Sequence, residues 1–171
     1  MKRDIKMRKK KHHCYEVEYI TLDNVNKYED VFYCNNEYYM ITEGRAATQS
    51  DCIETIEYTI EGISKNKFHN IGFADKGEPV ACLFVIEGYP DNDTLWIGLF
   101  LVHDKYKRKH IGTELIKDLI LSLKDTNIKR IRLSVQDNNS SGLSFWKNIG
   151  FSIVDKTESE SHNNFTMEYV I

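Results

Sequence analysis

Residues 99–113 read LFLVHDKYKRKHIGT, and this stretch decides the fold. Its apolar start is typical of a buried strand, which leaves through a basic loop and enters a helix. The first backbone N–H groups of such a helix have no partner inside it, and the helix dipole makes them a site for an anion, best of all a pyrophosphate. Gly112 allows close approach, and Lys107, Arg108 and Lys109 add positive charge. The alternative is a strand–helix loop that is basic by chance.

A second stretch lies one predicted strand further on, where residues 138–151 read NNSSGLSFWKNIGF. By itself it predicts an amphipathic helix with an asparagine cap, and Gly150 stands where a glycine commonly ends a helix. Helices of this kind are common. The two stretches together, at this separation and with this order of strands, are much less common, so jointly they indicate one particular kind of fold.

Periodicity along the rest of the chain predicts an α/β (α+β) fold. Gly77 marks the turn of a first hairpin, and Ser50 is expected to cap the second helix. The order β-α-α-β-β-β-α-β-α-β-β needs parallel and antiparallel neighbours, so we expect a central mixed sheet of about seven strands flanked by about four helices. The predicted strands are 15–20, 68–74, 79–86, 94–102, 130–135, 151–154 and 165–170, and the predicted helices are 23–33, 48–63, 110–124 and 140–148.

Composition and charge fit one globular domain, which we place at residues 14–171. The chain has 171 residues, of which 41% are hydrophobic. Residues 1–13 hold seven Lys or Arg and one acid, and taking these from the totals of 23 basic and 26 acidic residues leaves a net charge of −9 on the rest. An acidic body argues against nucleic acid as the main ligand and suits a cationic substrate such as an amine.

The basic segment 1–13 is expected to be a flexible, solvated tail, and the alternative is an arm that binds nucleic acid. No apolar stretch of signal-peptide length follows it, and no window approaches the roughly 18 apolar residues of a membrane span. We therefore expect a cytoplasmic protein with no membrane partner. We expect no metal site, and reduced thiols at Cys14, Cys34, Cys52 and Cys82, which form no CxxC pair.

The two stretches resemble the signature of the GNAT acetyltransferase family. In that family a strand ending in Val-x-Pro precedes Arg/Gln-x-x-Gly-x-Gly/Ala at the start of a helix, and Asn-x-x-Ala, a Tyr and Gly-Phe follow one strand later. The matching residues here are Val102-His103-Asp104, the run from Lys107 to Gly112, Asn139-Ser140-Ser141-Gly142, Trp146 and Gly150-Phe151. Met167-Glu168-Tyr169 resembles the family's last strand. Three further segments resemble a bacterial subgroup of the family, namely Tyr38-Tyr39, Gly88-Tyr89-Pro90 and Ile97-Gly98-Leu99.

The resemblance implies acetyl-CoA as the cofactor. The backbone of Leu101 and Val102 is then expected to hydrogen-bond the pantetheine arm, and the N–H of Val102 to hold the oxyanion of the reaction. Asn139 and Trp146 are expected to lie at the cofactor as well. The loop expected to cradle the pyrophosphate consists of Lys107, Arg108, Lys109, His110, Ile111, Gly112 and Thr113.

Several positions depart from the family pattern. Lys107 stands where Arg or Gln is usual, Asp104 stands at the proline position, and we expect His103, next to it on the loop, to face solvent. His110 replaces the first glycine, so we expect the loop not to adopt glycine-only dihedral angles there. Trp146 replaces the Tyr that protonates the leaving thiolate, and an indole N–H is no practical acid. Because a CoA thiolate leaves without much help, this change is expected to weaken activity without abolishing it.

The resemblance also implies an acyltransferase that moves an acetyl group to the primary amine of a small molecule, by direct attack in a ternary complex. An alkylamine with a pKa of about 10 has to lose a proton first. The strand 94–100, where the family often carries a glutamate base, holds no acid, so Glu87 becomes the candidate base. The other candidates are Tyr38, Tyr39, Glu87 and Tyr89 for acceptor binding, Tyr89 and Trp146 for catalysis, and Glu43 and Glu54 as weaker bases.

Two other functions stay open at this point. The first is a non-catalytic module of GNAT fold that binds and senses acyl-CoA, which Trp146 and the missing strand glutamate favour. The second is a nucleic-acid-associated protein that uses residues 1–13 and binds in a salt-dependent way. Family analogy also allows a homodimer. The acceptor itself is not identified among small amines, antibiotics, amino acids and protein N-termini.

Overall fold

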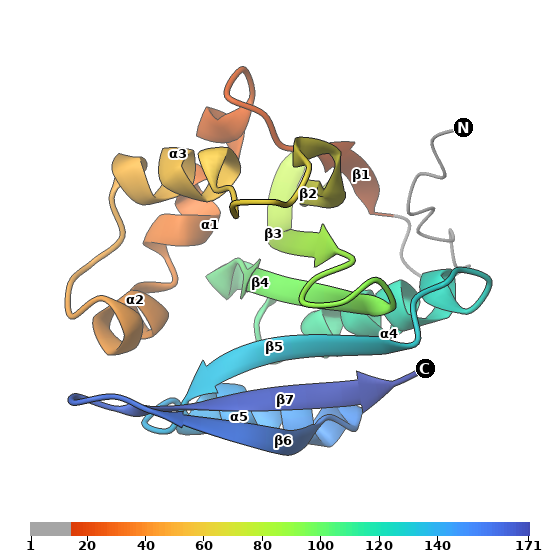
Figure 1. Cartoon of the computed structure of the whole chain (residues 1–171). Coiled ribbons are helices and arrows are strands. Elements are labelled where there is room, and N and C mark those ends of the chain that lie inside the picture. The colour runs from red at the N-terminus through yellow and green to blue at the C-terminus, as the bar shows by residue number, and fades with distance from the viewer. Residues whose placement is uncertain (1–14) are drawn as a thin grey trace.

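The computed structural model describes residues 15–171, so residues 1–14 lie outside the described residues, and with them the predicted basic tail and Cys14. The described chain forms one seven-stranded sheet (Figure 1). In order across the sheet the strands are β1 (Glu16–Tyr19), β2 (Phe68–Asp75), β3 (Glu78–Glu87), β4 (Thr94–Val102), β5 (Arg130–Gln136), β7 (Asn163–Val170) and β6 (Ser152–Glu158). Among the paired neighbours in residues 15–171, only β4 and β5 are parallel, so the predicted mixed sheet is confirmed.

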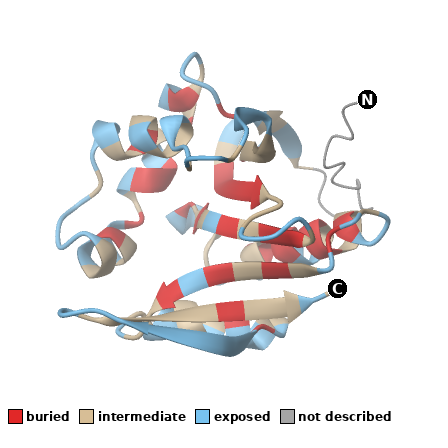
Figure 2. Ribbon diagram, in the orientation of Figure 1, coloured by how far each residue is buried: buried red, intermediate tan, exposed pale blue. Residues whose placement is uncertain are grey.

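Helices cover both faces of the sheet, and each face has its own hydrophobic core (Figure 2). One core lies under α4 and α5 and includes Leu119 and Leu133, and the other lies under the first three helices and includes Phe32 and Phe84. No helix within residues 15–171 is long and apolar enough to cross a bilayer. The helices are α1 (Glu29–Tyr33), α2 (Asn36–Thr42), α3 (Gln49–Glu57), α4 (Ile111–Leu123) and α5 (Ser140–Ile149), with 3-10 turns at Val25–Lys27, Lys65–Lys67 and Asp104–Tyr106.

The first half of the chain departs from the predicted elements. The predicted helix 23–33 is a 3-10 turn followed by the short α1, and α2 was not predicted at all. The reason is that α2 buries only Tyr39, so it has no periodic apolar stripe for the sequence to reveal. A helix that buries a single residue cannot be predicted from amphipathic periodicity.

The predicted helix 48–63 is shorter and is capped differently. It ends at Glu57, because Tyr58 takes an extended conformation with ψ of 133°. Thr48, not Ser50, is its N-cap and forms a capping box with Asp51. The Ser50 hydroxyl instead donates to Glu54 at 2.8 Å. By contrast, the predicted end of α5 is confirmed, since Gly150 takes the left-handed conformation with φ of 119°.

The sheet opens between β4 and β5. Their pairing runs only from Thr94 with Arg130 to Ile97 with Leu133, although β4 continues to Val102. Gly98 is a bulge at this point, because Phe84 of β3 pairs with Leu99 and the next residue pairs with Ile97. The last part of β4 therefore has a strand partner on the β3 side only.

Gly72 in β2 makes room for the ring of Tyr28, which is fully buried. A Cβ atom at residue 72 would lie 2.3 Å from Cζ of Tyr28. We expect Gly72→Ala to lower the free energy of unfolding by about 3 kcal/mol, because the ring has to leave its place or the strand has to shift. Urea unfolding measures this. Gly98→Ala is the control, because a Cβ atom at residue 98 would lie 3.7 Å from its nearest neighbour, and little loss of stability is expected. An equal loss in both variants would contradict the steric explanation.

Candidate functional site

The start of α4 presents free backbone donors beside basic side chains. The first hydrogen bond of the helix runs from the N–H of Glu114 to the carbonyl of His110 at 3.0 Å, so the N–H groups of residues 111–113 come before it. Nζ of Lys107 pairs with Asp104 at 2.6 Å, while Arg108 and Lys109 are exposed. This arrangement can bind an anion of high charge.

Two non-glycine residues of this loop have left-handed backbones, Arg108 with φ of 57° and His110 with φ of 61°. The left-handed region costs a non-glycine residue about 1–2 kcal/mol but is open to it. His110 thus takes a left-handed conformation that glycine favours but that other residues also reach, and its dihedral angles are not restricted to glycine. Gly112 follows in the first turn of α4, and a Cβ atom there would come within 3.3 Å of Val102 and Phe145.

The backbone of β4 faces the opening at alternate residues. The N–H of His103 donates to the carbonyl of Val80 at 2.8 Å, so Val102 and Ala81 form a pair without mutual hydrogen bonds. Alternation then turns the backbone of Val102 and Phe100 to the opening and that of Leu101 to Cys82 in β3. The Leu101 backbone therefore faces β3, contrary to the prediction that it faces the cofactor, whereas the backbones of Phe100 and Val102 face the opening.

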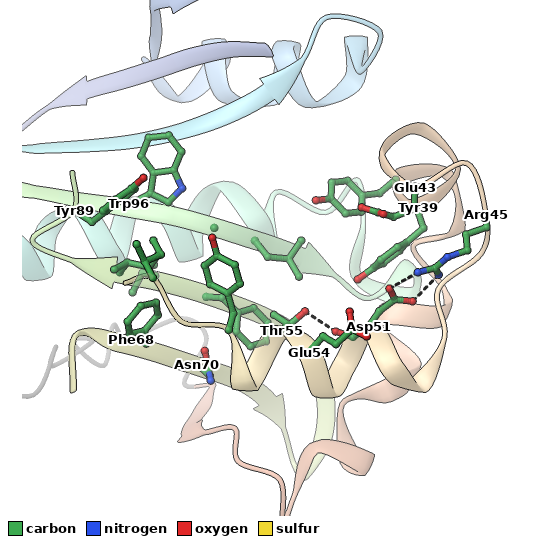
Figure 3. Close-up of a pocket in the computed structure, with 18 residues that line it drawn as sticks. Tyr39, Glu43, Arg45, Asp51, Glu54, Thr55, Phe68, Asn70, Tyr89 and Trp96 are labelled. Atoms are coloured by element: carbon green, nitrogen blue, oxygen red, sulfur yellow. Dashed lines mark hydrogen bonds and ion pairs between the residues drawn. The ribbon is translucent and has the colours of Figure 1, made fainter. Parts of the chain in front are cut away.

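A cavity of about 490 Å³ lies on the face covered by α2 and α3 (Figure 3). Its lining includes Gly98 of β4. Three of the predicted acceptor residues, Tyr38, Tyr39 and Tyr89, line it. The weaker candidate bases Glu43 and Glu54 line it as well. The remaining lining residues are Arg45, Asp51, Thr55, Tyr58, Ile60, Phe68, Asn70, Phe84, Val85, Ile86, Trp96 and Leu99.

Aromatic rings form much of the wall of this cavity. Tyr89 packs edge-to-face on Trp96 with ring centroids 5.8 Å apart, and Tyr38 packs in the same way on Tyr39 at 5.2 Å. Burial raises the pKa of Tyr38 and of Tyr39, so both phenols stay protonated near neutral pH. The wall thus offers ring faces to a cation and neutral hydroxyl groups for hydrogen bonds.

The charge of the cavity is negative. Arg45 binds both oxygens of Asp51 at 2.8 Å, and this ion pair cancels in charge. Two lining carboxylates remain, Glu43 from the end of α2 and Glu54 from α3. Both were only weaker candidates on the sequence, and Trp96 was missed, because its only signal was a tryptophan close to a glycine in an apolar strand.

Asp51 fixes the loop between α2 and α3 over the cavity. Its carboxylate also accepts from the N–H of Thr48 at 2.6 Å, and its side chain is 11% exposed. The Arg45 guanidinium, together with Thr48, holds the pKa of Asp51 well below its usual range. The stabilisation is therefore complete above the unfolded pKa of about 3.9 and is lost as the pH falls through the lower folded pKa.

We expect Asp51→Asn to lower the free energy of unfolding by about 1–2 kcal/mol at pH 7, through loss of the ion pair and weakening of the cap. The difference from the wild type should shrink as the pH falls below about 4, because protonation removes the same carboxylate charge. Urea unfolding from about pH 7 to about pH 2.5 tests this. Glu57→Gln, at the other end of α3, serves as the control. A difference that stays constant with pH would contradict the assignment to the Asp51 charge.

Glu87 lies away from the cavity, which contradicts its prediction as base and acceptor-binding residue. Along β3, Ala81 and Leu83 belong to the core under α4, and alternation places Glu87 on that same face. Glu87 is also not among the residues that line the cavity. Its carboxylate pairs with Lys67 at 3.0 Å and lies 3.5 Å from Nε2 of His69. No local pattern in the sequence indicates which face each β3 side chain takes.

Trp146 belongs to the core, which contradicts a catalytic role for its indole. It is 8% exposed and packs on Phe145, Phe151 and Phe100, with ring centroids 4.9, 5.1 and 6.1 Å away. An indole in such an aromatic cluster supports the position of α5 under β4. Its predicted contact with a cofactor stays a prediction.

Asn139 caps α5, since its Oδ1 accepts from the N–H of Gly142 at 2.9 Å. This cap uses Oδ1, and the predicted contact of Asn139 with the cofactor stays a prediction.

His103 is only 7% exposed, contrary to the expectation that it faces solvent. Within residues 15–171 no cluster of His, Cys, Asp or Glu side chains could hold a metal ion. Burial raises the pKa of the free thiol of Cys52 to about 12, so it stays protonated.

Comparison with known proteins places these features in a family. Residues 35–151, more than half of the chain, match the model of the acetyltransferase (GNAT) family. N-alpha-acetyltransferase 30 of Xenopus laevis is 34% identical over 56 residues, which are 33% of this chain. The match spans only 20% of the length of that relative.

Solved structures share the fold over nearly the whole chain. An acetyltransferase from Thermus thermophilus superposes with a TM-score of 0.74 at 15% identity, covering 92% of this chain and 97% of that one. The PaiA N-acetyltransferase of Thermoplasma acidophilum, solved in complex with coenzyme A, gives 0.65 at 17% identity, covering 93% and 100%. At these identities the likeness concerns the fold.

Proposed function

This chain belongs to the acetyltransferase (GNAT) family, and on that premise we propose that it transfers the acetyl group of acetyl-CoA to the primary amine of a small molecule. The acceptor binds in the aromatic, acidic cavity. The cofactor binds along the opening between β4 and β5, and the two meet in a ternary complex. Fold, family and site geometry support this proposal together.

One observation carries the proposal: the free edge of β4 joins the cavity to the start of α4. Gly98 and Leu99, the first residues after the pairing with β5 ends, line the cavity. From Gly98 the edge runs to Val102, a length of about 13 Å at about 3.3 Å per residue, and the loop to α4 follows. A long ligand with a highly charged end and a reactive end fits this path.

The residues along the path suit acetyl-CoA, which supplies an activated acyl group when bound. The N–H groups of residues 111–113 and the side chains of Arg108 and Lys109 would hold its phosphates. The backbone of Phe100 and Val102 would bind the pantetheine arm. Gly112 keeps the first turn of α4 free of a side chain where it lies against Val102 and Phe145.

The residues of the cavity would bind the amine and take its proton. An alkylamine is mostly charged at neutral pH, and a charged amine has no lone pair for attack. We assign the proton to the carboxylates of Glu43 and Glu54, because they line the cavity and no cation pairs with either among the described residues. The aromatic wall, including Trp96, would hold the cationic amine before it loses the proton.

The experiment is a thiol-release assay with acetyl-CoA and a panel of primary amines, including diamines, aromatic alkylamines, amino acids and short peptides. We expect CoA release that depends on one class of small amine and an acetylated product by mass spectrometry. CoA binding without release for any amine would instead support the non-catalytic acyl-CoA-binding module. Turnover with peptides alone would contradict the small-molecule acceptor.

A further inference from the structure

Asn35 and His103 are buried polar side chains at the end of β4. Apart from aromatic Tyr and Trp residues, only one other polar side chain in residues 15–171 is buried, Thr94 at the start of the same strand, and Asn35 is only 5% exposed. Burying a side-chain amide is costly unless it finds hydrogen-bond partners, so the contacts of Asn35 indicate why it is there.

Asn35 joins the turn before α2 to the end of β4. Its Nδ2 donates to the carbonyl of Val31 at 2.6 Å and to the carbonyl of Val102 at 3.1 Å. Both partners are carbonyl oxygens, which only accept, so a donor is needed at this place. Val102 is 67 residues away along the chain, and its backbone faces the opening of the sheet.

Asp30 of α1 and Cys34, the C-cap of α1, contact the two residues that follow Val102. Sγ of Cys34 accepts from the N–H of Asp104 at 3.4 Å, and Nε2 of His103 lies 3.6 Å from Oδ2 of Asp30. Nδ1 of the same histidine accepts from the N–H of Lys105 at 3.2 Å. Three consecutive residues, 102–104, are thus attached to α1 and the residues that follow it.

We propose that Asn35 is a positioning residue, which sets the acceptor cavity against the cofactor edge of β4 for the transfer reaction. This inference rests on the proposed function. Asn35 directly precedes α2, which carries Tyr38 and Tyr39 into the cavity. On its other side it holds Val102, the last residue of the free edge (Figure 1 shows the tip of β4 near α1 and α2). One buried amide therefore connects the two halves of the site.

The expected signature is a loss in turnover with little loss in cofactor binding. A displacement of about 1 Å between reacting groups can cost about 100-fold in rate. The cofactor contacts along the rest of β4 and at the start of α4 do not involve Asn35. A residue that merely stabilised the fold would lower activity only as far as it lowered the folded fraction.

The test compares Asn35→Ala with Thr94→Val, a matched control that removes a buried polar group at the opposite end of the same strand. We expect Asn35→Ala to lower kcat by about 10- to 100-fold and to change KM for acetyl-CoA by less than about threefold. Thr94→Val should keep kcat within about threefold. Asn35→Ser keeps a hydrogen-bond donor in the form of a hydroxyl, so its kcat should fall between those of the wild type and of Asn35→Ala. An unchanged kcat in Asn35→Ala, or an equal loss in Thr94→Val, would overturn the proposal.

Amide hydrogen exchange gives a readout that does not need turnover. In the wild type, CoA should slow exchange in residues 36–42 as well as in residues 102–113, and Asn35→Ala should remove the effect on residues 36–42 only. If CoA changes nothing in the wild type, the proposed function fails. The inference is then judged on the unliganded proteins, where Asn35→Ala must speed exchange in residues 36–42 and 103–106 together. Faster exchange in only one of these segments would overturn it.

Discussion

Arg108→Glu combined with Lys109→Glu is expected to weaken acetyl-CoA binding at least about 100-fold while leaving the fold intact. Both side chains are exposed beside the first turn of α4, so their exchange creates no steric conflict. A hydrogen bond to a charged group is worth about 1.5–3 kcal/mol, and reversal adds repulsion from the phosphates. A loss of about 3 kcal/mol corresponds to the predicted change of about 100-fold.

Isothermal titration with CoA measures this effect, with Lys124→Glu combined with Lys129→Glu as the control. The control makes the same change in net charge, but at exposed residues near the far end of α4. It should bind CoA within about threefold of the wild type at about 0.15 M salt, where distant charges are screened. Equal weakening in both pairs would mean that overall charge, and not the loop, governs affinity.

Glu43→Gln combined with Glu54→Gln is expected to lower kcat/KM for the amine at least about 100-fold, since a general base contributes about 10²- to 10⁴-fold. Both carboxylates line the cavity, and their removal also takes its negative charge away from a cationic acceptor. Gln has nearly the same shape, so the cavity should keep its volume. The variant should still bind CoA like the wild type.

Glu87→Gln is the matched control, because it changes a carboxylate on the other face of β3. Its activity should stay within about threefold of the wild type, since the change affects only the contacts of Glu87 with the half-exposed Lys67 and with His69, away from the cavity. Steady-state kinetics of both variants, with an amine found in the thiol-release screen, measures which carboxylates the reaction needs. Full activity in the double variant would exclude Glu43 and Glu54 as the base, and a large loss in Glu87→Gln would return that role to Glu87.

The second half of the fold was predictable from sequence because it is locally determined. The strand, basic loop and helix of residues 99–113 carry their own signals, and Gly150 ends α5 as expected for a residue that has to take a positive φ. The candidate anion site at the start of α4 follows from this order of elements alone. The same holds for the mixed sheet, whose single parallel pair requires a helical crossover.

The acceptor side was not predictable, because it depends on register and on contacts between distant residues. Whether Glu87 faces the cavity is set by the pairing of β3 with β2 and β4, and a shift by one residue would turn it over. Gly98 in an apolar strand was the one local sign of the bulge. The contact of Asn35 with Val102 joins segments 67 residues apart, and nothing in either segment alone reveals it.

Thermal unfolding of the wild type and of Gly112→Trp, each with CoA, acetyl-CoA or no ligand, tests the central claim most directly. A dissociation constant in the micromolar range gives about 4 kcal/mol of stabilisation at millimolar ligand, which raises Tm by several degrees or more. We predict this rise in the wild type and none in Gly112→Trp, whose indole would crowd Val102 and Phe145 at the start of α4. No rise in the wild type, or the same rise in both proteins, would contradict the assignment of the cofactor to this site.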